Sequence, residues 1–153
     1  MIRKAQIKDV KDIQKLLTSY ANRGDMLSRS LSELYESLRD FYVCEEEGKL
    51  MGTAALHIVW EDLAEVRSVA VVEDVARKGI GSQLVQACVA ESRAVGLKRI
   101  FCLTYKPDFF EKHGFRLVDK SELPHKVWGD CLKCVKFPDC DENAMILDLS
   151  QPF

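Results

Sequence analysis

Two glycines stand two residues apart in the stretch VARKGIGSQL (75–84), where a helix is about to begin. Glycine is unfavourable inside a helix, so Gly79 and Gly81 need a reason for their place. A helix N-terminus presents unpaired backbone N–H groups and a partial positive charge, and a residue without Cβ lets a phosphate approach them closely. Arg77 and Lys78 add positive charge next to these groups. The pattern therefore favours a pyrophosphate site built from backbone amides.

Two other phosphate motifs do not fit this stretch. A P-loop needs Lys and Ser or Thr after its second glycine, whereas Ser82 and Gln83 follow here. A dinucleotide fingerprint needs a third small residue where the chain has Leu84, and a tighter turn than the segment from Val72 to Gly79 allows. An ordinary glycine-rich turn stays as the alternative, because two glycines alone are a weak motif.

A second group of reactive residues lies in the tail, where Cys131, Cys134 and Cys140 have the spacing C-x₂-C-x₅-C. Cys-x-x-Cys is a common half of a zinc site, but structural zinc needs four ligands. His125, Asp141 or a partner subunit would have to supply the fourth. A redox pair, or thiols near a substrate lid or a subunit contact, are the alternatives. We expect no metal here.

The elements that must position these residues follow from periodicity and breaker residues, which predict the order β-α-α-β-β-β-α-β-α-β-β. The nearly uninterrupted apolar run RIFCLT (99–104) indicates a strand buried on both faces, with a parallel neighbour. We therefore expect one α/β domain spanning residues 1–153. Its mixed central sheet would be antiparallel early in the chain, parallel around the glycine-rich helix, and flanked by helices.

The strand that precedes the glycines alternates along AEVRSVAVV (64–72). Since successive side chains of a strand point to opposite faces, Glu65, Arg67, Val69 and Val71 are expected to share one face.

The composition limits the classes of function. The 153 residues are 47% hydrophobic and 30% charged, with a formal net charge of −2, so nucleic acid and anionic membranes are not expected partners. No apolar run is long enough to cross a bilayer, and MIRKAQIKDVKDIQ (1–14) has no apolar signal region. We expect a cytoplasmic chain with reduced thiols, in which Cys44, Cys88 and Cys102 pack as small hydrophobic residues.

The segment VRSVAVVEDVARKGIGSQLVQACVAESRAVGLKRIFCL (66–103) resembles the acetyl-CoA motif of the GNAT N-acetyltransferases, and FFEKHGF (109–115) resembles the following helix and strand of that superfamily. The resemblance implies the GNAT fold and acetyl-CoA as co-substrate. It also implies a pantetheine site and a pyrophosphate site on the backbone. The residues concerned are Val69, Ala70 and Val71 for pantetheine, and Arg77, Lys78, Gly79, Ile80, Gly81 and Ser82 for pyrophosphate. Ala76 departs from the family, which usually has Gln or Arg there.

A closer resemblance lies outside the shared core. GDMLSRSLSELYESLRDF (24–41), ALHIVWEDLAEVRSVAV (55–71), LTYKPDFFEKHGF (103–115) and DKSELPHKVWGDC (119–131) are similar to the stand-alone acetyltransferase type of bacterial N-acetylglutamate synthase. This implies acetyl transfer to the α-amine of L-glutamate, the first step of arginine biosynthesis, by direct attack in a ternary complex. Longer members carry a kinase-like domain that binds arginine, for which this chain has no room.

The implied reaction needs a base for the ammonium group and a donor for the thioester oxygen. Glu65 stands where histone-type GNAT enzymes keep their catalytic Glu; the alternative is a solvent-facing carboxylate or an ion pair with Arg67. The family's frequent acid is a Tyr where this chain has Phe110, so Tyr105 is the nearest substitute. A thiolate with a pKa near ~8.5 can also leave without an acid.

Cations are needed for the substrate carboxylates, and the related synthases tend to carry one near Arg29. Arg67 is the second candidate, since it is expected on the same strand face as Glu65. Glutamine, another small amine or a protein amine are alternative acceptors, and an acetyl-CoA-binding sensor without activity is the non-enzymatic alternative. A homodimer is expected only by analogy with GNAT proteins of this kind.

Overall fold

The computed structural model describes residues 1–24, 26, 28–73, 79–123 and 143–149. Seven strands form one sheet in the order β1-β2-β3-β4-β5-β7-β6. The strands are β1 (Ile2–Lys4), β2 (Phe41–Glu46), β3 (Lys49–Trp60), β4 (Leu63–Val71), β5 (Arg99–Thr104), β6 (Arg116–Val118) and β7 (Asn143–Asp148). The helices are α1 (Val10–Asn22), α2 (Leu31–Glu36), α3 (Ile80–Ala94) and α4 (Pro107–Glu111). This order of helices and strands confirms the one expected from the sequence.

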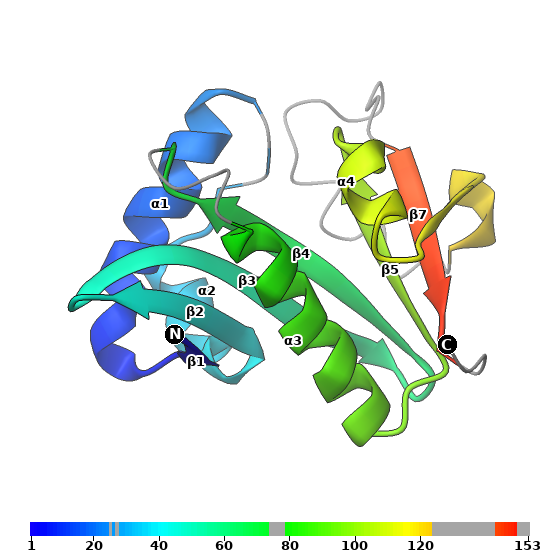
Figure 1. Cartoon of the computed structure of the whole chain (residues 1–153), viewed down its shortest axis with the longest axis horizontal. Coiled ribbons are helices and arrows are strands. Elements are labelled where there is room, and N and C mark those ends of the chain that lie inside the picture. The colour runs from blue at the N-terminus through cyan, green and yellow to red at the C-terminus, as the bar shows by residue number, and fades with distance from the viewer. Residues whose placement is uncertain (25, 27, 74–78, 124–142, 150–153) are drawn as a thin grey trace.

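The sheet is mixed, as expected. β4 and β5 run parallel, and every other neighbouring pair of described strands is antiparallel. Helix α3 connects the parallel pair and crosses one face of the sheet (Figure 1). A parallel pair needs such a crossover, because its strands cannot be joined by a tight hairpin. The glycine-rich stretch thus lies where β4 leads into the crossover helix.

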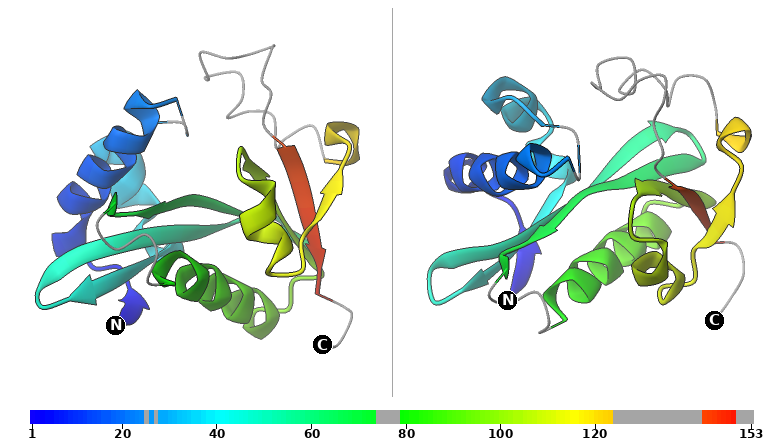
Figure 2. Two further views of the ribbon diagram at one scale, coloured as in Figure 1. Left: turned by 45° about the horizontal axis from the view of Figure 1, so that its top comes forward. Right: turned by 90° about the horizontal axis from the view of Figure 1, so that it is seen from above.

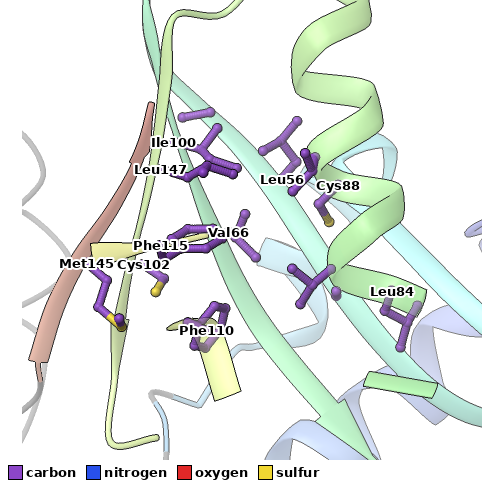
Figure 3. Packing of buried hydrophobic residues seen from close by; sticks show 14 of the residues in the cluster. Leu56, Val66, Leu84, Cys88, Ile100, Cys102, Phe110, Phe115, Met145 and Leu147 are labelled. Atoms are coloured by element: carbon purple, nitrogen blue, oxygen red, sulfur yellow. The ribbon is translucent and has the colours of Figure 1, made fainter. Parts of the chain in front are cut away.

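Helices cover the two faces of the sheet unequally. Helix α3 lies on one face, and α1 and α2 lie together on the other (Figure 2). On the α3 face, Leu84 and Cys88 point toward the strands that carry Leu56 and Val66 (Figure 3). On the opposite face, a smaller cluster joins α1 and α2 to β2, β3 and β4. Its buried members are Val10, Ile13, Leu17, Leu34, Phe41, Val43, Ala55 and Ala70.

A β-bulge interrupts the alternation expected along β4. Arg67 pairs with Ala55 and Ala70 pairs with Thr53, so two residues of β4 oppose one residue of β3. Ser68 has a positive φ of 57°, which is typical of such an irregularity. The expectation that Val69 and Val71 share the face of Glu65 is therefore wrong. Both pack with the α3-side cluster, while Ala70 joins the α1 side.

Candidate active site

The parallel strands β4 and β5 separate beside Glu65. They pair only from Leu63 with Arg99 to Glu65 with Phe101, although β4 continues to Val71 and β5 to Thr104. Figure 1 shows the two strands diverging beyond this point. Past Glu65, the described part of β5 forms no ladder with β4, so one backbone edge of β4 is left for other partners. We call this edge, from Val66 to Val71, the open edge of β4.

Strand alternation decides which backbone groups face the open edge. The Ala70 carbonyl lies near Gly52 of β3, and the Val72 N–H donates to the Met51 carbonyl on the same strand. The N–H and C=O groups of Val71 therefore point away from β3. By the same alternation Val69 is the better candidate for the open edge than Ala70.

Helix α3 begins next to the end of this edge. Gly79 is its N-cap with a φ of 78° and makes no side-chain capping bond. A Cβ at Gly79 would meet no atom within 4 Å among the described residues, so the left-handed backbone, rather than crowding, explains this glycine. A Cβ at Gly81 would lie 3.4 Å from Phe109 Cζ and 3.5 Å from Val71 Cγ2. These are ordinary van der Waals distances, so the start of α3 packs beside β4 and α4, and crowding does not explain this glycine.

Neighbouring side chains support the first turn of α3. His113 Nδ1 lies 2.7 Å from Gln86 Nε2, and His113 Nε2 lies 3.3 Å from Ser82 Oγ. Burial lowers the pKa of His113, and the charge of Lys112 adds to this effect. A neutral imidazole can accept from Gln86 and donate to Ser82, so it positions a residue expected at the pyrophosphate. Arg77 and Lys78, the expected cations, lie outside the described residues.

Glu65 lies at the fork and is largely buried. Its Oε1 is 3.6 Å from Nη1 of Arg67, and the two side chains are 14% and 15% exposed. Their neighbours Ala64 and Val66 face α3. Because side chains alternate along a strand, Glu65 and Arg67 lie on the α1 side of the sheet. The fork therefore brings a carboxylate and a guanidinium together on one face, as expected for these two residues.

Arg29 lies directly before α2, on the same side of the sheet. Ser30 caps this helix and forms a capping box with Glu33, which fixes the chain at Arg29. The Arg29 side chain is only 11% exposed and its Nη1 is 3.6 Å from Glu33 Oε2. Gln14 of α1 donates to its carbonyl at 3.3 Å. The Arg29 side chain is thus largely buried rather than extended into solvent.

Phe110, at the position of the family's acid, and Tyr105, its candidate substitute, have different surroundings. Phe110 is buried against Phe109 and Phe115, with ring centroids 5.1 and 5.3 Å away, so it is a core residue. Tyr105 is half-buried and directly follows β5, the strand that forms one side of the fork. The position of Tyr105 is compatible with a role at the site, and that role stays a prediction.

Two further side-chain contacts involve β4 or the strand beside it. His57 pairs with Glu65 across β3 and β4, and residues directly opposite in a sheet share a face. Its Nδ1 lies 2.8 Å from Asp40 Oδ2. Tyr20 of α1 hydrogen-bonds the backbone of Val71 through its hydroxyl. Both contacts join distant segments, and no local spacing in the sequence indicates them.

The three cysteines of the described residues are packing residues, as expected. Cys44, Cys88 and Cys102 are buried free thiols, and burial raises the pKa of Cys88 to about 12, which suits a packing residue. The three tail cysteines lie outside the described residues. In the part of the chain that is described, no group of three or more His, Cys, Asp or Glu residues could hold a metal ion. That part also contains no helix long and apolar enough to cross a membrane.

Comparison with known sequences gives a family and close relatives. The chain matches the acetyltransferase (GNAT) family over residues 10–115. It is 37% identical over 148 residues to an N-acetyltransferase of Chlorobaculum tepidum, covering 97% of this chain and 96% of that one. It is 35% identical over 133 residues to the amino-acid acetyltransferase of Mycobacterium tuberculosis, covering 85% of this chain and 76% of that one.

Solved structures agree with these matches. A Mycobacterium tuberculosis protein in complex with CoA has a TM-score of 0.83 at 30% identity, covering 97% of this chain and 98% of that one. The N-acetylglutamate synthase of Neisseria gonorrhoeae, complexed with coenzyme A and N-acetyl-glutamate, has a TM-score of 0.89 at 26% identity. That match covers 99% of this chain but 35% of the synthase, so the likeness is to one part of the longer protein.

Proposed function

Because this chain belongs to the GNAT family of acetyltransferases, we propose that it transfers the acetyl group of acetyl-CoA to the α-amine of L-glutamate. The observation that carries the proposal is the position of Glu65 at the fork of β4 and β5. A buried carboxylate stands there beside the open edge, on the face that also carries Arg67 and Arg29. The names of the related amino-acid acetyltransferase and N-acetylglutamate synthase support an amino-acid acceptor. We take residues 1–153 as a single acetyltransferase domain.

The donor half of the site uses backbone groups. Pantetheine carries amide groups and would pair with the open edge of β4 through Val69 and Val71, as an added strand does. The pyrophosphate would bind the amides at the start of α3 from Gly79 to Ser82, with further charge from Arg77 and Lys78. Since a Cβ at Gly81 would lie only 3.5 Å from Val71 Cγ2, these two parts of the proposed donor site adjoin each other.

The acceptor half supplies charge and a base. Arg29 and Arg67 would bind the substrate carboxylates, for which the planar guanidinium is well suited. Glu65, directly or through one water, takes a proton from the substrate ammonium. The free amine then attacks the thioester carbonyl, the C–N bond forms, and a backbone N–H on the open edge stabilises the developing oxyanion. The C–S bond breaks, the nitrogen loses its second proton, and CoA leaves as a thiolate that takes up this proton or one from Tyr105.

A thiol-release assay with acetyl-CoA tests the acceptor. We expect turnover with glutamate about tenfold or more above that with leucine and lysine, because only acidic substrates match both arginines. Glutamine shares the α-amine and α-carboxylate, so its rate relative to glutamate measures the contribution of the side-chain carboxylate. 2-Oxoglutarate, which lacks the amine, is the negative control.

Two outcomes would contradict the proposal. Faster release with polyamines or peptides than with any amino acid would indicate another acceptor class. No release with any amine, together with acetyl-CoA binding measured by calorimetry, would indicate a sensor rather than an enzyme.

A further inference from the structure

The hydroxyl of Tyr20 occupies the open edge of β4. It accepts a hydrogen bond from the Val71 N–H at 3.1 Å and donates one to the Val71 carbonyl at 2.7 Å. Tyr20 belongs to the last two turns of α1 and is 51 residues away in sequence. One side chain thus satisfies both backbone groups of Val71, the pair that an added strand or an amide ligand would use.

These two hydrogen bonds conflict with a ligand on the same groups. A backbone N–H has a single hydrogen, so it makes one well-aligned hydrogen bond at a time. An amide of pantetheine paired with Val71 would need the same hydrogen and the same side of the strand. The tyrosine hydroxyl and the pantetheine amide are therefore mutually exclusive partners of the Val71 N–H.

The contacts around Tyr20 show that it can be released. The guanidinium of Arg23 lies 4.4 Å from the centroid of the Tyr20 ring and forms an ion pair with Glu73 at 2.6 Å. The ion pair is exposed, so it contributes little to holding the ring in place. Tyr20 itself is only half-buried at the edge of the α1-side cluster. Moving the ring therefore costs the two bonds to Val71 and the contacts of a half-buried side chain, rather than those of a fully buried one.

We propose that Tyr20 is a built-in competitor of acetyl-CoA, whose hydroxyl must leave Val71 when pantetheine binds. The inference rests on the proposed function, because it requires pantetheine to lie along the open edge of β4. Its consequence is that Tyr20 lowers the affinity for the donor. The free energy lost with the hydrogen bonds of the hydroxyl offsets part of the free energy gained from those of the ligand.

Calorimetric titration of Tyr20→Phe with CoA tests this. The variant keeps the ring and removes the competing hydroxyl, so its dissociation constant for CoA should fall about 3- to 10-fold, the range expected for one net hydrogen bond. Adenosine 3′,5′-bisphosphate lacks pantetheine, and its dissociation constant should stay within about twofold. Tyr35→Phe, an exposed tyrosine on α2, is the matched control and should change neither constant.

The outcomes separate this inference from the proposed function. Weaker or unchanged CoA binding by Tyr20→Phe would overturn the inference, because a supporting residue weakens binding when lost. An equal gain for both ligands would overturn it as well, since the effect would then not involve pantetheine. If wild-type protein bound adenosine 3′,5′-bisphosphate and CoA equally weakly, the proposed donor site itself would fail.

A measurement on the wild-type chain covers the case that the variant folds poorly. With ¹³C-labelled tyrosine, the ring resonance of Tyr20 should move on saturation with CoA and stay in place with adenosine 3′,5′-bisphosphate. A Tyr20 resonance that does not move at saturating CoA would show that the hydroxyl stays on Val71, and would contradict the proposal.

Discussion

At the scale of single residues, Glu65 is the group on which the proposed chemistry depends. Glu65→Gln keeps the shape of the side chain and removes its ability to take a proton. We expect kcat near pH 7 to fall about 10²- to 10⁴-fold, the usual contribution of a general base. The dissociation constant of acetyl-CoA should stay within about twofold, because the proposed donor site uses backbone groups elsewhere. Steady-state kinetics and calorimetry measure the two quantities.

Glu61→Gln is the matched control for this variant. Glu61 is exposed in the turn between β3 and β4, near in sequence but away from the fork. It should leave kcat unchanged. A Glu65→Gln enzyme with nearly full activity would show that Glu65 serves only as the ion partner of Arg67, 3.6 Å away.

Arg29 is predicted to determine affinity for the acceptor rather than the rate of transfer. Arg29→Ala should raise KM for glutamate by the loss of a charged hydrogen bond, about 1.5–3 kcal/mol, with a smaller effect on kcat. Arg29→Lys should recover only part of this, because an ammonium cannot form the two parallel bonds of a guanidinium. Initial rates over a range of glutamate concentrations give both constants.

Glu33→Gln separates this role from a structural one. It removes the partner of Arg29, 3.6 Å away, but leaves the guanidinium. If both Arg29→Ala and Glu33→Gln lowered stability alike while KM stayed constant, Arg29 would be a structural residue beside a helix cap.

Single residues also show which parts of a site a sequence can predict. The places of Glu65 in a strand and of Gly79 at a helix start could be predicted, because each depends on one local element. Their roles stay predictions. The contacts of His57 with Asp40 and of Tyr20 with Val71 join segments far apart in the chain. Such contacts depend on how the elements pack, and no periodicity encodes them.

At the scale of elements, the approach of α3 to the sheet depends on Gly52 of β3. A Cβ there would lie 3.0 Å from Leu84 Cδ1, 3.1 Å from the Ala70 carbonyl oxygen and 3.1 Å from Ile80 Cγ2. Gly52→Ala should therefore push the start of α3 away from β4. We expect a loss of about 1–3 kcal/mol in the free energy of unfolding, as for other overpacked cores, and weaker CoA binding.

Gly96→Ala provides the comparison at the other end of α3. Gly96 has a φ of 88°, so the variant should also lose stability, by about 1–2 kcal/mol, through backbone strain. Its CoA affinity should be unchanged, because the helix start stays in place. Urea unfolding and calorimetry on both variants test this. Equal effects of the two substitutions on CoA binding would show that the CoA affinity depends on stability and not on the position of α3.

Most helices and strands could be predicted from the sequence, and the bulge in β4 is the exception. Helix α1, the capped start of α2 and the apolar strand β5 each follow from the spacing of their own residues. The bulge in β4 does not, because Ser68 is an ordinary strand residue in an alternating stretch. Its effect is to place Val69 and Val71 on the α3 side, next to the helix that starts at Gly79. The proposed donor site therefore depends on an irregularity that the alternating pattern does not reveal.

At the scale of the whole molecule, the first strand is tied to the first helix by a buried ion pair. Arg3 of β1 binds both carboxylate oxygens of Asp9, at 2.8 and 3.1 Å, and Asp9 Oδ2 also accepts from the Gln6 N–H at 2.7 Å. The Asp9 side chain is 8% exposed. Since β1 is the edge strand and α1 covers the face with Glu65, this pair joins the sheet edge to the helix that carries Tyr20.

The pair also determines how the fold responds to acid. The hydrogen bonds from Arg3 hold the pKa of Asp9 below its ordinary value of 3.8, against the opposing effect of burial. A carboxyl with a lowered folded-state pKa contributes stability above its unfolded pKa and loses it as the pH falls through the folded-state pKa. Asp9→Asn should therefore be less stable at pH 7, by about 3–5 kcal/mol for a broken buried pair, while differing less from wild type near pH 2. Asp12→Asn, exposed on the same helix, should show no such convergence. Urea unfolding at both pH values measures this, and a stability difference that stays constant between them would mean that Asp9 contributes by packing and not by its charge.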